Sequence, residues 1–184
     1  MTAFTYTKPT LTAIVFPPSN RRPIVDILDH SFPSPQDRLI HTIDLFHASE
    51  LEAAVFGVLT HLLPDHYVLA NIDLHLIFDF HRVKATLGPE LAEFLLLSSH
   101  VDFYISARGS DPSPFGLELD GPHHTNPWNC RQHVRDKKKN LLFCRSGLPL
   151  VRVRPKVIFR RGEDQSIAAF EGDLRLLFQT IGVP

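Results

Sequence analysis

Two alternating segments joined by a turn-rich link constrain this sequence more than any other feature. In residues 101–106, Val101, Phe103 and Ile105 alternate with Asp102, Tyr104 and Ser106, and residues 115–120 repeat this pattern. The link between them contains RGSDPSP, which is rich in turn-forming residues. Two period-2 segments connected in this way predict a β-hairpin with one apolar and one polar face.

The polar face of this predicted hairpin carries three acids. Glu118 and Asp120 share a face because side chains alternate along a strand, and pairing in phase places Asp102 beside Glu118. Like charges opposite each other destabilise a sheet, so a divalent cation is the simplest compensation. Mg²⁺ suits one or two carboxylates and keeps several waters. The alternative is a solvent-facing strand whose acids have no chemical role.

Other segments predict an α/β domain. We expect further strands near residues 11–16, 67–72 and 148–153, and a helix that begins at Ser34-Pro35. A second helix begins with a capping box of Ser49 and Glu52 and stops before Pro64. Further helices are expected within residues 88–97, 131–145 (ended by Gly147) and 164–181. The expected parts are a Pro-rich arm and helix (1–48), a core (49–155) and a C-terminal helical extension (156–184).

Positive charge is concentrated in residues 129–161. This segment holds eleven Lys and Arg and one acid, hence +10, while the rest of the chain holds 8 bases and 19 acids, hence −11. Such a segment attracts phosphates, although a solvated helix face followed by a basic loop explains it too. The residues that we expect to contact nucleic acid are Arg131, Arg135, Lys137, Lys138 and Arg152. Arg152, at a strand end, either contacts phosphate or lays its aliphatic stem on the surface.

Composition argues against a membrane or secreted protein. There is no run of ~18 apolar residues, and the start MTAFTYTKPT lacks the order of a signal peptide. Two cysteines, Cys130 and Cys144, do not form a disulfide framework. We therefore expect a cytoplasmic protein.

The motifs occur in an order that resembles the PD-(D/E)XK, or restriction-endonuclease-like, nuclease superfamily. The similarity is greatest to a bacterial, mostly uncharacterised branch related to very-short-patch-repair endonucleases, and it covers roughly residues 49–155. The matching motifs are a capped helix start at 49–52, Val101-Asp102-Phe103, Glu118-Leu119-Asp120-Gly121, His124, Asp136 with Lys139, and residues 147–152.

The resemblance implies a restriction-endonuclease-like core, with a mixed sheet of about four strands flanked by helices and a metal site on the central hairpin. The implied activity is an Mg²⁺-dependent endonuclease that hydrolyses phosphodiester bonds, in DNA, with Mn²⁺ as a substitute. By position, Asp102 and Glu118 would be the metal carboxylates, and the carbonyl of Leu119 would add a ligand. Glu52 would contact the metal or its water, or serve only in the capping box.

One position departs from the superfamily pattern. Asp120 stands where the family usually has a lysine that positions or activates water. His124 could act as the acid-base group instead, or Lys139 could supply the charge from the next helix. The structural alternatives are a His124 that bonds Asp120, a solvated Lys139, and an Asp136 that pairs with an arginine.

Other interpretations remain open. The departure at Asp120 supports a catalytically inactive nucleic-acid-binding module, and an interaction or toxin–antitoxin component is a third possibility. The oligomeric state is open, a homodimer included. His123, His124, Cys130 and His133 could form a zinc site, but they lack a Cys-x2-Cys pair. The paired histidines also resemble those of ββα-metal nucleases, but no third histidine follows at the right place, so we reject that interpretation.

Overall fold

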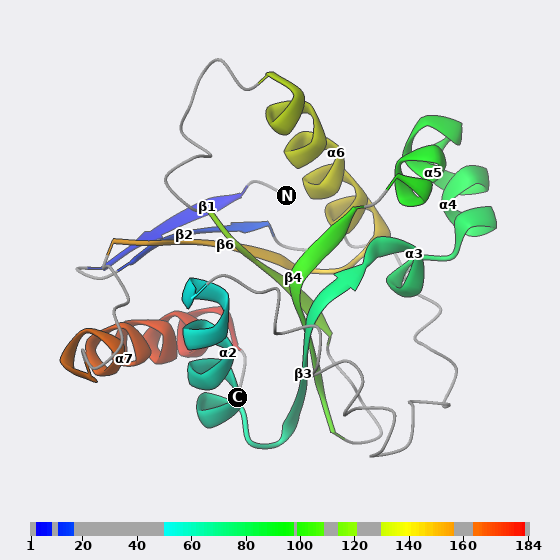
Figure 1. Cartoon of the computed structure of the whole chain (residues 1–184). Coiled ribbons are helices and arrows are strands. Elements are labelled where there is room, and N and C mark those ends of the chain that lie inside the picture. Colours follow the sequence, from blue (N-terminus) through cyan, green and yellow to red (C-terminus); the bar gives the residue numbers. More distant parts are fainter. Residues whose placement is uncertain are drawn as a thin grey trace.

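The computed structural model describes residues 3–8, 11–16, 50–97, 99–108, 114–120, 130–156 and 164–182. These residues form one six-stranded mixed sheet with helices on both faces (Figure 1). The strands are β1 (Phe4–Thr7), β2 (Leu11–Phe16), β3 (His66–Asp73), β4 (His100–Ala107), β5 (Phe115–Leu119) and β6 (Leu150–Pro155). The helices are α2 (Glu50–Leu62), α3 (Leu74–Ile77), α4 (Phe80–Leu87), α5 (Pro89–Leu96), α6 (Cys130–Ser146) and α7 (Asp164–Ile181). None of these helices is long and apolar enough to cross a bilayer.

The strand order is β1-β2-β6-β5-β4-β3. Strands β3, β4 and β5 pair antiparallel, β5 and β6 pair parallel through the α6 crossover, and β2 and β1 continue antiparallel beyond β6. The predicted hairpin is confirmed, with Phe103 opposite Leu117 and Ile105 opposite Phe115. The prediction of about four strands is wrong, because the segment predicted as an N-terminal arm supplies β1 and β2 to the sheet.

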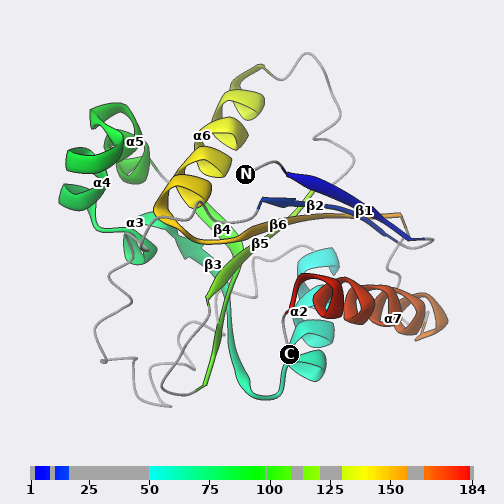
Figure 2. The same cartoon turned by 180° about the vertical axis from the view of Figure 1, so that it is seen from behind.

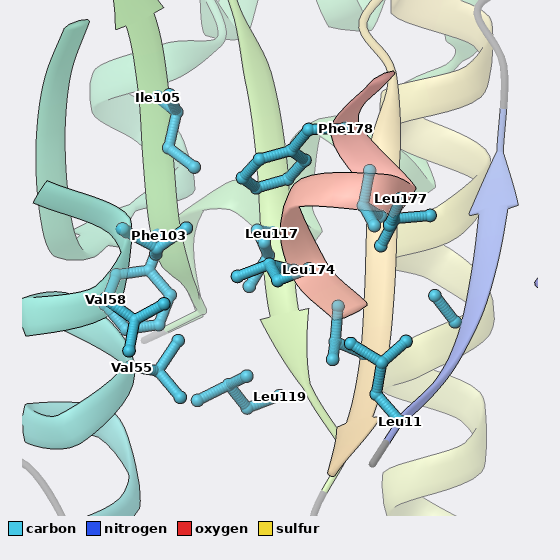
Figure 3. Close-up of a cluster of buried hydrophobic side chains, with 14 of the residues drawn as sticks. Leu11, Val55, Val58, Phe103, Ile105, Leu117, Leu119, Leu174, Leu177 and Phe178 are labelled. Atoms are coloured by element: carbon cyan, nitrogen blue, oxygen red, sulfur yellow. The ribbon is translucent and has the colours of Figure 1, made fainter. Parts of the chain in front are cut away.

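One face of the sheet packs against α2 and α7 (Figure 3). The apolar side chains of the hairpin, among them Phe103, Leu117 and Leu119, point to this face and meet Val55 and Leu174 from the two helices. Side chains from β2, such as Leu11, join the same cluster. The N-terminal strands and the C-terminal helix are therefore parts of this core.

The opposite face is also covered, so the polar side of the predicted hairpin does not face solvent. Helices α3–α6 lie on this side (Figure 2), and Tyr104 of β4 is buried there with Phe143 of α6 and Leu150 of β6. The polar side chains of the hairpin thus project under a helical layer instead of into bulk water. This burial changes the electrostatics of every acid on that face.

Gly116 permits the close approach of α6 to β5. A Cβ atom at this position would lie 2.6 Å from Cε1 of Phe143, well inside van der Waals contact. The Phe143 ring also meets Phe78 edge-on, with 5.0 Å between the ring centroids. Because Gly116 has no side chain, α6 can pack closely against β5, the strand that carries Glu118.

Most of the predicted local elements are confirmed. Helix α2 ends before Pro64, and α6 ends where Gly147 takes a positive φ of 81°. The strand at 11–16, the strand around 67–72 and the C-terminal helix are present as expected. Helices α3 and α4 have no counterpart in the sequence-based prediction. The helix predicted from Ser34 and the cap at Ser49 lie outside the described residues.

Candidate active site

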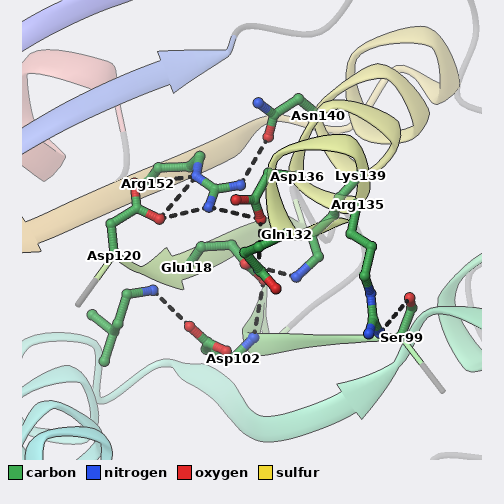
Figure 4. Close-up of polar contacts among 11 residues, drawn as sticks. Ser99, Asp102, Glu118, Asp120, Gln132, Arg135, Asp136, Lys139, Asn140 and Arg152 are labelled. Atoms are coloured by element: carbon green, nitrogen blue, oxygen red, sulfur yellow. Dashed lines mark hydrogen bonds and ion pairs between the residues drawn. The ribbon is translucent and has the colours of Figure 1, made fainter. Parts of the chain in front are cut away.

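Two carboxylates meet where β4 and β5 lie side by side (Figure 4). The Asp102 backbone N–H donates to Oε1 of Glu118 at 3.3 Å, and the Leu119 N–H donates to Oδ2 of Asp102 at 2.6 Å. The side chain of Glu118 is 5% exposed. The adjacency of Asp102 and Glu118 that in-phase pairing predicts is therefore confirmed, but inside a covered site.

Lys139 reaches this pair from α6. Its Nζ donates to Oε2 of Glu118 at 2.7 Å, and the lysine side chain is only 12% exposed. The structural alternative of a solvated Lys139 is therefore wrong. A buried cation next to two acids neutralises one of the two negative charges and leaves a second carboxylate beside it.

The burial of Asp102 has an electrostatic consequence. Desolvation, followed by the charge of Glu118, raises the pKa of Asp102 from 3.8 to about 7. The Leu119 N–H and the Lys139 ammonium act in the opposite direction, and Glu52 adds to the increase. The ionised form of Asp102 therefore destabilises the folded protein, and a bound cation would offset this loss of folding free energy.

These groups line a cavity of about 300 Å³. Its walls come from α2, α5, α6 and the two central strands, so that side chains distant in sequence converge. The lining residues are Glu52, Phe94, Ser99, His100, Asp102, Glu118, Leu119, Gln132, Arg135, Asp136 and Lys139. The cavity therefore contains all four residues predicted to bind metal.

The residue set fits a hard cation that needs few protein ligands. Among the described residues no group of three or more His, Cys, Asp or Glu side chains is arranged to hold a metal ion. Mg²⁺ does not require such a cage, because it commonly takes one or two carboxylates and retains water. Asp102 and Glu118 meet that requirement, and a bound cation would offset the burial and the Glu118 charge that raise the pKa of Asp102.

Asp120 belongs to a separate buried network (Figure 4). Arg152 of β6 donates to Asp120 Oδ1 through Nη2 at 2.6 Å and through Nε at 3.1 Å. The same guanidinium lies 3.2 Å from Oδ1 of Asp136 and donates to Oδ1 of Asn140 at 3.1 Å. This network joins α6 to β6 and to the residue that follows β5, and its Asp136 lies about one helical turn before Lys139.

The network corrects one prediction and confirms another. Arg152 does not end its strand or extend over the surface, since it lies within β6 and is 5% exposed. Its burial and its ion pairs do not fit a phosphate contact. The alternative in which Asp136 pairs with an arginine is confirmed. A charged residue between two valines in a strand, as in LVRV, was the available sequence signal for this buried role.

The remaining residues predicted to bind nucleic acid lie on α6, and they differ in how exposed they are. Arg131, Arg135 and Lys137 are exposed on α6, whereas Lys138 forms a 2.9 Å ion pair with Glu90 of α5. His124 lies outside the described residues, as does the loop that the zinc interpretation needs. The sequence-based analysis missed the cavity positions of Ser99, His100 and Gln132, because no motif contains them.

A model of the family described as "Protein of unknown function (DUF2726)" matches residues 45–166, which is more than half of the chain. Comparisons with curated proteins and with solved structures gave no match.

Proposed function

The chain belongs to the DUF2726 family, whose function is unknown, and we propose that it is an Mg²⁺-dependent nuclease that hydrolyses phosphodiester bonds in DNA. One observation carries this proposal: two adjacent carboxylates and a lysine, contributed by two strands and a helix, face one cavity. The restriction-endonuclease-like core is part of the same proposal. The sheet, in which β4, β5 and β6 adjoin and α6 links β5 to β6, is compatible with it.

Asp102 and Glu118 would hold the cation, with the Leu119 carbonyl and Glu52 as further oxygen donors at the cavity wall. When bound, the ion would supply positive charge to phosphate oxygens and lower the pKa of water. Oxygen ligands of this kind are those that Mg²⁺ prefers, and Mn²⁺ would substitute.

Lys139 supplies the positive charge that the superfamily's usual lysine supplies from the position of Asp120. The Asp120 carboxylate is occupied by Arg152, whereas the Lys139 ammonium stands at Glu118 inside the cavity. From there Nζ can donate a hydrogen bond to a phosphate oxygen or to the attacking water. A fixed donor of this kind stabilises the charge that develops as water adds to phosphorus and the P–O bond to the leaving oxygen breaks.

A basic surface next to the cavity supports nucleic acid as the substrate. Arg131, Arg135 and Lys137 are exposed on α6, and Arg135 also lines the cavity wall. Exposed cations of one helix that leads to the carboxylate pair would hold the phosphate backbone across the site.

The test is a cleavage assay on supercoiled plasmid, single-stranded DNA and RNA, with Mg²⁺, Mn²⁺ or EDTA. We expect metal-dependent cleavage that Glu118→Gln and Lys139→Met each reduce by ~10²-fold or more. Glu93→Gln on the exposed side of α5 is the matched control, since it removes a carboxylate outside the cavity. Wild-type protein that cleaves none of these substrates with either metal would refute the proposal.

A second function is favoured by the Lys139–Glu118 ion pair itself. At 2.7 Å and with little exposure, this pair satisfies one carboxylate without any metal. A binding module that kept the fold but lost catalysis would show the same contact. Such a protein would bind nucleic acid equally well in Mg²⁺ and EDTA and would leave it uncut.

A further inference from the structure

A second hollow of about 410 Å³ lies between α5 and α6, next to the candidate active site. Its apolar part includes Leu97 and Val134, which are 58% and 53% exposed. We call this hollow the α5–α6 groove, and it is lined by Phe94, Leu97, Arg131, Val134, Arg135 and Lys138.

The charged residues that the structure describes along this groove are all basic. Arg131 and Arg135 are exposed, one helical turn apart on α6. Lys138 continues the row and is held in place by Glu90 Oε1 at 2.9 Å. An apolar floor with a cationic rim complements a ligand that is apolar in its body and anionic along its edge.

The groove adjoins the cavity of the carboxylate pair. Phe94 and Arg135 line both hollows. The Arg135 side chain stands at the boundary, where its Nη2 lies 3.4 Å from Oγ of Ser99, another cavity residue. A chain molecule with one phosphate in the cavity can therefore place its neighbouring unit in the groove.

We propose that the α5–α6 groove holds an unpaired nucleotide next to the bond that is cut, so that the substrate is single-stranded or locally unpaired nucleic acid. An unpaired base presents an apolar face to Leu97 and Val134, while its phosphates meet the basic rim. In a duplex both faces of the base are stacked and cannot reach a groove floor. This inference rests on the proposed nuclease function and adds its substrate class.

The groove also predicts weak sequence preference. Its apolar side chains can contact the face of a base. Its charged side chains are Arg and Lys, which pair with phosphate oxygens. Readout of a particular base requires donors and acceptors matched to its edge. Contacts through the face of the base tolerate any sequence.

The test measures binding by fluorescence anisotropy in EDTA, where cleavage is blocked. The probes are a labelled 12-nucleotide single strand, the same sequence as a duplex, and the same strand with abasic sites, which keep the phosphates but lose bases. We expect the intact strand to bind about tenfold more tightly than the abasic strand. The double variant Leu97→Ser/Val134→Ser should abolish this difference.

The matched control is Leu96→Ser/Leu176→Ser, which removes two exposed leucines outside the groove and should leave the difference intact. Equal affinity for intact and abasic strands would overturn the inference, as would duplex binding more tightly than single strand. Tighter binding of an acidic, leucine-containing peptide would assign the groove to a protein partner, and a dimer that the double variant dissociates would assign it to a second copy of the chain. Base-dependent binding without cleavage in any metal would uphold the groove and refute the nuclease.

Discussion

Replacing Asp102 by asparagine should stabilise the metal-free protein, and increasingly so as the pH rises. Burial and the adjacent Glu118 raise the pKa of Asp102 from 3.8 to about 7 in the folded state. The folded protein therefore binds this proton more tightly than the unfolded chain does. The stability contributed by protonated Asp102 is complete below about pH 4 and is lost as the pH rises through about 7.

The size of the effect follows from the shift. Because each pKa unit corresponds to 1.36 kcal/mol, the rise in the pKa of Asp102 from 3.8 to about 7 destabilises the folded state by about 4 kcal/mol once Asp102 is ionised. Asparagine has no such titration, and its carbonyl oxygen can still accept the Leu119 N–H. The difference in the free energy of unfolding, Asp102→Asn minus wild type, should thus grow by about 4 kcal/mol between pH 4 and pH 8, or roughly 10 °C in Tm.

The assay is urea unfolding in EDTA at one-unit pH intervals from 4 to 9. Glu93→Gln is the control, because this exposed carboxylate lies outside the cavity. A difference between Asp102→Asn and wild type that does not change with pH would refute the argument. Saturating Mg²⁺ should then stabilise the wild type at pH 8 and leave Asp102→Asn unchanged, which tests the metal site separately.

Three further predictions concern packing, the buried network and the basic surface. Gly116→Ala should destabilise the fold by about 2 kcal/mol in urea unfolding, because its Cβ meets a ring of α6, whereas Gly172→Ala, where nothing lies within 4 Å, should be neutral or stabilising. Arg152→Met should cost about 3–5 kcal/mol by the same measurement, since it removes the buried guanidinium that pairs with Asp120 and Asp136, and a cost below 1 kcal/mol would contradict the network. Arg131→Gln with Lys137→Gln should reduce the slope of log affinity against log salt by about 0.7 per lost phosphate contact on single-stranded DNA, and an unchanged slope would place the contact surface elsewhere.

The sequence alone determined the parts of this protein that depend on neighbours along the chain. The alternation around Asp102 and Glu118 predicted both the hairpin and the placement of these two acids on the same face, because side chains along a strand alternate with a period of two residues. The helical pattern before Gly147 likewise defined α6, with a left-handed glycine after its last turn. The local order of motifs was sufficient to single out Lys139 as one of two alternatives to the residue at position 120.

Only the tertiary structure shows which strands pair over long sequence distances and which helices cover each face of the sheet. Strand β2 pairs with β6, which is more than a hundred residues away in sequence, and no local period encodes such a pairing. The alternation in the hairpin could not show that α6 covers its polar face, since a polar row looks the same facing water or facing a buried cavity. The packing of α6 against Gly116 accompanies the 2.7 Å contact between Lys139 and Glu118 and the burial of Arg152 between Asp120, which follows β5, and Asp136 of α6. Burial then raises the pKa of Asp102, because the cost of holding a charge depends on the surroundings in three dimensions and not on the adjoining residues.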